Sequence, residues 1–109
     1  MKTIHYAGDE LLTGDEIADA VVEYAAALAR GESSAALSIP TMDDRGEVVQ
    51  VSMLLGPASQ LIVTPATGDE RELRDELLVA RIDRDTRGLG IARAEVFEQM
   101  PASDEDYGV

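Results

Sequence analysis

The chain has 109 residues, a formal net charge of −13 and no cysteine, and 45% of its residues are hydrophobic. This length fits one domain with a modest aliphatic core, and the lack of cysteine excludes disulfides, thiolate metal sites and thiol catalysis. The excess of acids argues against direct binding to nucleic-acid phosphates and against binding to an anionic membrane surface.

No segment of the sequence is typical of a membrane span or a secretory signal. The most apolar window, residues 20–29, is short and interrupted by Glu23, whereas a spanning helix needs about 20 apolar residues. The N-terminus lacks the long apolar run of a signal peptide. The composition is rich in Ala, Asp and Arg, with Lys2 as the single lysine, which is typical of bacteria with GC-rich genomes. We therefore expect a soluble, cytoplasmic bacterial protein.

The first expected element is a short strand. Residues 3–7 (TIHYA) mix β-branched and aromatic side chains, a combination that favours a strand. Residues 8–12 (GDELL) contain a glycine and two acids before two leucines, and they predict a loop or a turn that packs a leucine on the core.

A helix is predicted over residues 15–30. It follows the stretch TGDE, in which Thr13 and Glu16 have the spacing of a capping box. Gly31 suits the position after a helix end. Apolar residues recur at helical spacing and form one stripe that we expect to be buried, consisting of Ile17, Ala20, Val21, Tyr24 and Leu28.

A β-hairpin is predicted around a turn at residues 43–46, where Gly46 suits a positive φ. Apolar and other side chains alternate in the arm that contains Pro40 and again in the return arm, residues 46–55. Pro40 cannot donate to a ladder, so its strand is an edge strand or ends there. Residues 60–64 (QLIVT) predict a third strand of this group, and the short connecting loops predict antiparallel neighbours.

The stretch TGDE occurs a second time, at residues 67–70, and precedes a densely charged segment. The spacing of Thr67 and Glu70 again fits a capping box, and a helix from about residue 70 to 84 is predicted. The alternative is a hairpin that pairs LLVARI with IARAEVFE. The two copies do not mark a repeat, because a shift of 54 positions places Arg71 on Ile17. The shared tetrapeptide is interpreted as one capping signal used twice.

The chain is divided by these patterns into three parts. Residues 1–65 form the expected α+β core, and residues 66–98 form a charged C-terminal element that is helical and packed on the core. Residues 99–109 are acidic and contain breakers, so they predict a flexible tail.

No catalytic, cofactor-binding or metal-ligating residue is predicted, and no cofactor is expected. His5, the single histidine, is interpreted as a surface or packing residue. Asp43 and Asp44 fit turn chemistry, and the acids of residues 104–106 fit a solvated tail. Two glycine motifs, Gly88-Leu89-Gly90 and the stretch after Gly56, lack the context of a nucleotide or phosphate site.

The expected fold is α+β: a small, mostly antiparallel sheet in the order β-α-β-β-β, with one amphipathic helix on a face, then a charged helix and a disordered acidic tail. One sheet face is left for the C-terminal segment or a partner to cover. The leading functional hypothesis is a non-enzymatic protein-interaction or regulatory module, with a protein partner or self-association as a homodimer. A nucleic-acid mimic that binds a basic protein and a small carboxylate-based, metal-dependent enzyme are the alternatives.

Overall fold

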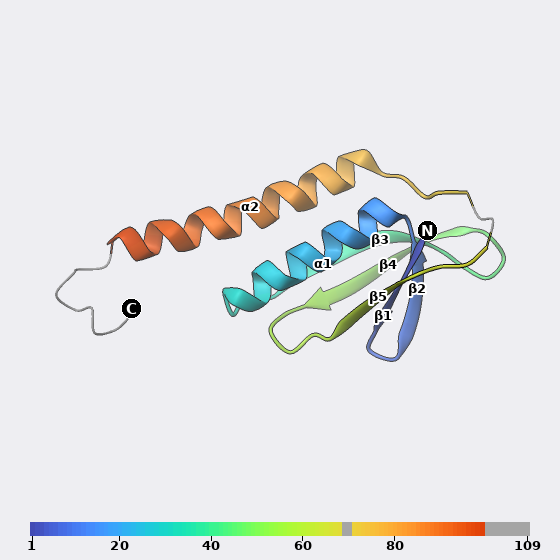
Figure 1. Cartoon of the computed structure of the whole chain (residues 1–109), viewed down its shortest axis with the longest axis horizontal. Helices are drawn as coiled ribbons and strands as arrows, with labels where there is room; N and C mark the ends of the chain where they lie inside the picture. Colours follow the sequence, from blue (N-terminus) through green and yellow to red (C-terminus); the bar gives the residue numbers. More distant parts are fainter. Residues whose placement is uncertain (69–70, 100–109) are drawn as a thin grey trace.

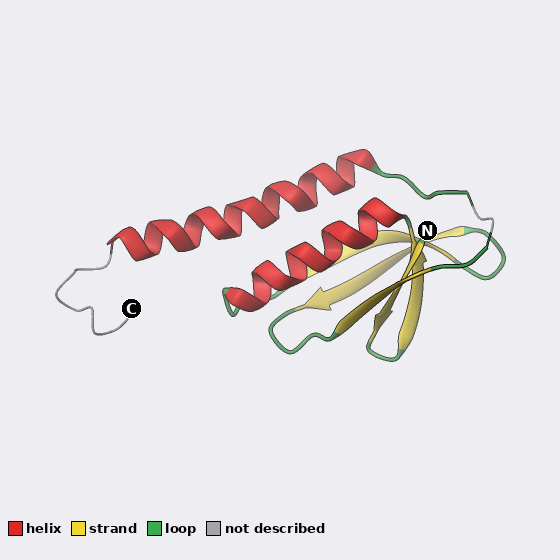
Figure 2. Ribbon diagram, viewed as in Figure 1, coloured by secondary structure: helices red, strands yellow, loops and turns green. Residues whose placement is uncertain are grey.

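The computed structural model describes residues 1–68 and 71–99, with side chains through residue 90. It has a five-stranded antiparallel sheet, a helix packed on one face of that sheet, and a second helix packed on the first (Figures 1 and 2). This confirms the predicted α+β class. In chain order the elements are β1 (Lys2–Tyr6), β2 (Asp9–Thr13), α1 (Asp15–Arg30), β3 (Ala35–Met42), β4 (Val48–Leu55), β5 (Leu61–Pro65) and α2 (Glu76–Gln99).

Helix α1 has the bounds that the sequence predicts, and its apolar stripe is buried. Ile17 and Val21 are fully buried against sheet residues that include Ile39 and Leu55. Full burial of such side chains contributes roughly 1.5–3 kcal/mol each. The buried arc of α1 also includes Ala18 and spans roughly half of the helix circumference at about 100° per residue. It is wider than a single stripe because the sheet covers one side of α1 and α2 covers another.

Residues 9–13 form a strand, so the predicted loop at 8–12 is wrong. Strand β2 pairs antiparallel with β1, with Ile4 opposite Leu11 and Tyr6 opposite Asp9. The connection is a two-residue turn in which Ala7 (φ 52°) and Gly8 (φ 85°) both have positive φ, as a tight hairpin requires. Alanine is uncommon in that conformation, so the turn lacks the usual sequence signal.

The sheet order is β4-β3-β2-β1-β5, which contradicts the expectation that β5 lies beside β4. Strand β5 pairs with β1, and Tyr6 lies opposite Leu61. In a flat sheet, four spacings of about 4.8 Å would separate the two edges by about 19 Å. Residues 56–60 join those edges through a turn in which the Ser59 N–H donates to the Gly56 carbonyl. The sheet is therefore rolled, so that the end of β4 comes close to β1. There the Tyr6 hydroxyl of β1 donates to the Leu54 carbonyl of β4.

Thr13 does not cap α1, so the predicted first capping box is wrong. Its side chain is buried at the end of β2, and its hydroxyl donates to the Pro40 carbonyl at 2.7 Å. The N-cap is Gly14, which makes no side-chain capping bond. The carbonyl of Pro40 faces β2, and the nitrogen of the same residue faces the same way, away from β4. The lack of an N–H at Pro40 therefore removes no hydrogen bond between β3 and β4. On the other side of β3, the pairing with β2 is limited to Leu12 opposite Met42.

The second helix begins at Glu76 and ends at Gln99, so the predicted start near residue 70 and the hairpin alternative are both wrong. Asp75 is the cap: its carboxylate accepts the Leu78 N–H at 3.1 Å, and its carbonyl accepts the Val79 N–H. Of the second TGDE, Asp69 and Glu70 lie outside the described residues, as do residues 100–109 of the predicted tail. The division of the chain at residue 66 stays a prediction.

Helix α2 packs along α1, on the side away from the sheet (Figure 1). Leu78 and Ile82 of α2 are buried in the same core cluster as the α1 stripe, whereas Leu77 is 85% exposed. The pKa of Tyr24 on α1 is raised, mainly by burial and also by the Asp85 carboxylate of α2. The described part of the C-terminal segment therefore covers α1, and no described helix covers the other face of the sheet.

Residues 71–75 link the sheet to α2 by crossing the start of α1. The Glu72 carboxylate accepts the Asp15 N–H at 2.6 Å and the α-amino group of Met1 at 2.8 Å. Asp15 Oδ1 is buried and lies 3.0 Å from the same amine. The amine is therefore the partner of this carboxylate oxygen as well as of Glu72. A carboxylate from a distant part of the chain thus replaces the expected N-terminal cap of α1.

The ion pair between Glu72 and the α-amino group of Met1 should stabilise the fold fully only over a limited pH range. Its hydrogen bonds to the amine and to Asp15 lower its pKa below 4.5, so the stabilisation is lost as pH falls through the folded value. Hydrogen bonds to Glu72 and Asp15 raise the pKa of the amine above 8.0, so that contribution is lost as pH rises through the folded value. Both contributions are therefore fully present between the ordinary pKa values of the two groups, 4.5 for Glu72 and 8.0 for the amine.

In that range, Glu72→Gln is expected to lower the free energy of unfolding by about 1 kcal/mol, since the remaining amide carries no charge. Urea unfolding from pH 3 to pH 10 measures this, and the difference between variant and wild type should shrink at both extremes. Glu23→Gln, on the exposed side of α1, is the control. A difference that stays constant across the pH range would contradict the assigned ion pair.

Candidate interaction surface

The sheet face opposite α1, called here the outer face, is built by lateral rows of side chains. Residues that lie opposite one another on paired strands point to the same face. The register places five residues in one row across all strands, and a second row crosses β2, β1 and β5 beside it. The first row is Val48, Met42, Leu12, Thr3 and Thr64, and the second is Glu10, His5 and Ile62.

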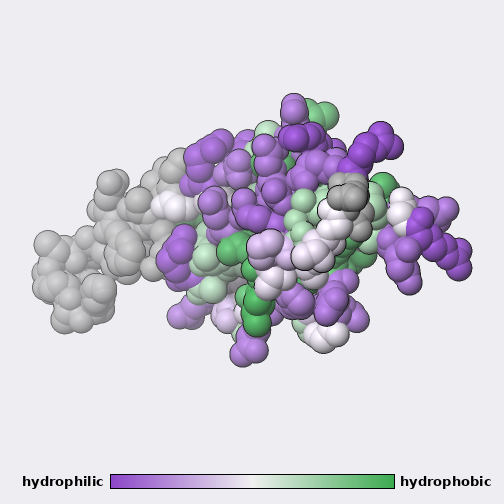
Figure 3. Space-filling model, turned by 45° about the vertical axis from the view of Figure 1, so that its right-hand side comes forward, coloured by the Kyte–Doolittle hydropathy of each residue, from purple (hydrophilic) through white to green (hydrophobic). Residues whose placement is uncertain are grey.

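The outer face exposes large apolar side chains. Ile62 and Leu54 are each 63% exposed and Val48 is 58% exposed, and the register places all three on this face. Figure 3 shows apolar side chains in the lower half of the body, whereas the upper part, where α2 lies, is mostly hydrophilic. No described helix covers this face, although residues 71–75 line a cleft with Val48 and Gln50 at its β4 edge. Apolar exposure of this kind is typical of an interaction surface.

A hollow of about 850 Å³ lies on the outer face. The first row supplies part of its floor, and residues 43–46 and 65–67 supply its rim. The rim loop is fixed by Asp43, whose carboxylate accepts the N–H groups of Arg45 (2.9 Å) and Glu47 (2.8 Å). Gly46 has the positive φ (81°) that the sequence predicts. Asp43 thus has the turn role expected of it, and the rim carries the charges of Asp44 and Arg45.

His5 lies on the outer face between two polar side chains from neighbouring strands. Its Nε2 is 3.1 Å from the Thr64 hydroxyl, and its Nδ1 is 3.9 Å from a Glu10 carboxylate oxygen. The distance from Nδ1 to Glu10 is too long for a hydrogen bond. Glu10 therefore does not orient the His5 imidazole as the third member of a nucleophilic triad would. His5 is a surface residue, as predicted, and its two neighbours could be found only once β2 was known to be a strand.

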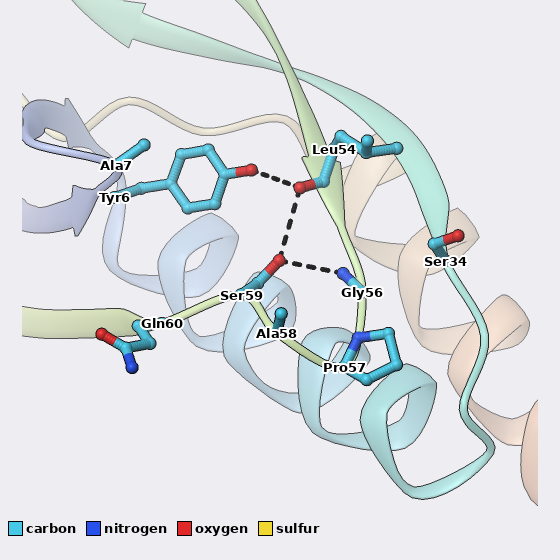
Figure 4. A pocket seen from close by; sticks show the side chains of 9 residues that line it. All are labelled: Tyr6, Ala7, Ser34, Leu54, Gly56, Pro57, Ala58, Ser59 and Gln60. Carbon is cyan, nitrogen blue, oxygen red and sulfur yellow. Dashed lines mark hydrogen bonds between the residues drawn. The ribbon is translucent and has the colours of Figure 1, made fainter.

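A second cleft, of about 480 Å³, lies where the β4–β5 connection meets the end of β1 (Figure 4). Four of its polar groups, from Tyr6, Leu54, Gly56 and Ser59, are paired with one another. The Leu54 carbonyl accepts the Tyr6 hydroxyl and, at 3.5 Å, the Ser59 hydroxyl. Ser59 Oγ in turn accepts the Gly56 N–H at 2.9 Å. The Gly56 N–H is therefore occupied and does not offer a donor to a phosphate.

The remaining sequence candidates do not converge on a site. Gly88, Leu89 and Gly90 lie inside α2, not in the turn between a strand and a helix that a dinucleotide site requires. Residues 104–106 lie outside the described residues. Among the described side chains, no group of three or more His, Asp or Glu could hold a metal ion.

Apolar and hydroxyl side chains thus form the outer face, and the charged turn at residues 43–46 lies at its rim. None of the helices in the described ranges has the length and apolar character needed to cross a membrane. No protein-family model, curated protein or solved structure matches this chain.

Proposed function

We propose that this protein is a non-enzymatic protein-interaction module of the cytoplasm, and that it binds a protein partner through the outer face of its sheet. One observation carries the proposal: α2 packs on α1 and leaves the outer face, with Ile62, Leu54 and Val48 exposed, without a covering element among the described residues. The net charge of −13 keeps the chain soluble despite this apolar surface.

The chemistry of the outer face indicates what its partner presents. The rows offer Leu12, Met42 and Ile62 to apolar side chains, and Thr3 and Thr64 to hydrogen-bonding groups. The rim and floor of the hollow include the carboxylates of Asp43, Asp44 and Glu10 beside one guanidinium, from Arg45. A partner with an apolar centre and basic groups at its periphery fits this distribution, because charges at a rim guide encounter and apolar contacts provide affinity.

The test uses Ile62→Glu, with Leu77→Glu as the matched control. Ile62 lies on the outer face and Leu77 is the more exposed residue, at 85%, but lies on α2. Proteins captured from a lysate of the source organism by the wild-type chain are purified and titrated against all three proteins. The proposal predicts a loss of affinity of about tenfold or more for Ile62→Glu and no change for Leu77→Glu.

Two results would contradict the proposal: a partner whose affinity is the same for both variants, or no saturable partner of the wild-type chain. An association that Ile62→Glu leaves intact and that about 0.5 M salt abolishes would favour mimicry of a nucleic acid instead.

A further inference from the structure

Strand β4 forms one edge of the sheet, and its sequence and register lack the charge, proline or bulge that often prevents edge strands from pairing. Its eight residues, VVQVSMLL, include no charged residue and no proline. Its register with β3 runs without a bulge from Leu55 opposite Ala35 to Val48 opposite Met42. Natural edge strands usually carry a charge, a proline or a bulge because a bare edge accepts another strand.

Two hydrogen bonds establish which backbone groups of β4 point outward. The Thr41 hydroxyl of β3 donates to the Val49 carbonyl, which therefore faces β3. The Leu54 carbonyl accepts the Tyr6 hydroxyl and faces the open side. Because successive residues of a strand alternate, Val48, Gln50 and Ser52 also direct their N–H and C=O groups to the open side. No hydrogen bond to these groups is made by residues 1–68 or 71–90 or by the backbone of residues 91–99.

We infer that β4 pairs antiparallel with β4 of a second copy of this chain, about a twofold axis at Gln50. In this register Gln50 lies opposite Gln50 of the second copy, and Val48 lies opposite Ser52 of the second copy, twice by symmetry. All three are pairs of residues that exchange both hydrogen bonds across an antiparallel interface. The pairing ends at Ser52 because the next outward carbonyl, that of Leu54, is occupied by Tyr6.

Charge opposes a second copy less at this edge than over the rest of the chain. Two chains of net charge −13 repel each other over most of their surfaces, but β4 is uncharged along its whole length. The proposed register places the acidic turn at residues 43–44 beside the uncharged residues 56–57 of the second copy. On the inner side of the edge, Val49, which is 43% exposed, meets Val51 of the second copy. An isologous contact of this kind joins two sheets into one of twice the width.

Because the native chain has no cysteine, a single introduced thiol tests the register. In Gln50→Cys the two Cα atoms lie about 5.5 Å apart across the axis, inside the range for a disulfide. We expect mild oxidation to convert this variant largely to a covalent dimer. Val48→Cys is the matched control. In the dimer of this variant the two thiols lie four residues apart along the paired strands, about 13 Å, so the variant is expected to stay uncrosslinked. Equal crosslinking of the two variants would overturn the register.

Sedimentation of the full-length wild-type chain tests the dimer itself, and a mass of twice the chain's 11.7 kDa is expected. Gln50→Pro removes an N–H that points away from β3, and Gln50→Lys places like charges opposite each other; both are expected to give folded monomers by circular dichroism. A wild-type chain that stays monomeric at about 100 µM, well above the dissociation constant of a micromolar dimer, would overturn the inference. So would a dimer that survives both folded variants. The inference does not rest on the proposed partner-binding function, whose test residue Ile62 lies on the other edge strand.

Discussion

Gly14→Ala is expected to be among the most destabilising single substitutions in this chain. A Cβ added at Gly14 would lie 1.8 Å from the Leu73 carbonyl oxygen and 2.9 Å from its carbon. Both are backbone atoms, so no side-chain rotation relieves the overlap, and the crossing segment 71–75 must move away from α1. Gly14 has φ −70° and ψ 155°, which any residue adopts, so close approach alone explains the glycine. We expect a loss of about 3 kcal/mol or more in the free energy of unfolding.

Gly88→Ala is the matched control, with an expected effect of opposite sign. Gly88 lies inside α2, and a Cβ there meets no atom within 4 Å. Alanine favours a helix by about 0.5–1 kcal/mol over glycine, so this variant should be more stable than wild type. Urea unfolding of the two variants gives both values. Wild-type stability in Gly14→Ala would contradict the path of residues 71–75 across the start of α1.

Ile82→Ala is expected to cost about 2–4 kcal/mol, because it removes a buried side chain between the two helices. Ile82 is 1% exposed and belongs to the same core cluster as the α1 stripe. Leu77→Ala, one turn and a half earlier on the same helix, removes a side chain that is 85% exposed and is expected to change stability by less than about 0.5 kcal/mol.

This pair of variants distinguishes a packed α2 from a helix that only extends from the body. Thermal and urea unfolding followed by circular dichroism should show one cooperative transition, shifted only in Ile82→Ala. Equal effects of the two substitutions would mean that α2 does not contribute its buried face to the core.

The parts of the fold that local sequence determines were predictable. The bounds of α1 follow from the spacing of Ile17, Val21 and Leu28, and the β3–β4 hairpin follows from alternation about Gly46. The start of α2 did not follow, because its cap is Asp75 and residues 71–75 before it are not helical. In the first TGDE stretch the threonine matches the capping motif, but its buried hydroxyl bonds to the Pro40 carbonyl of a distant strand instead.

The order of the strands and the candidate surface depend on contacts between distant residues, and these were not predictable. Short loops favoured β5 beside β4, but the rolled sheet brings its two edges together, so a short loop joins them without pairing. The rows on the outer face depend on register across five strands. The neighbours of His5, for example, come from β2 and β5, and β2 carries no strand signal strong enough to outweigh its acids.

The position of α1 between the sheet and α2 has a consequence for how the protein opens in solution. Detachment of α2 uncovers one side of α1 and leaves the side against Ile39 and Leu55 in place, whereas exposure of the full α1 stripe requires the sheet to separate as well. Amide protons in the middle of α1 should therefore exchange with deuterated solvent only through global unfolding, and those of α2 should exchange earlier through a partial opening.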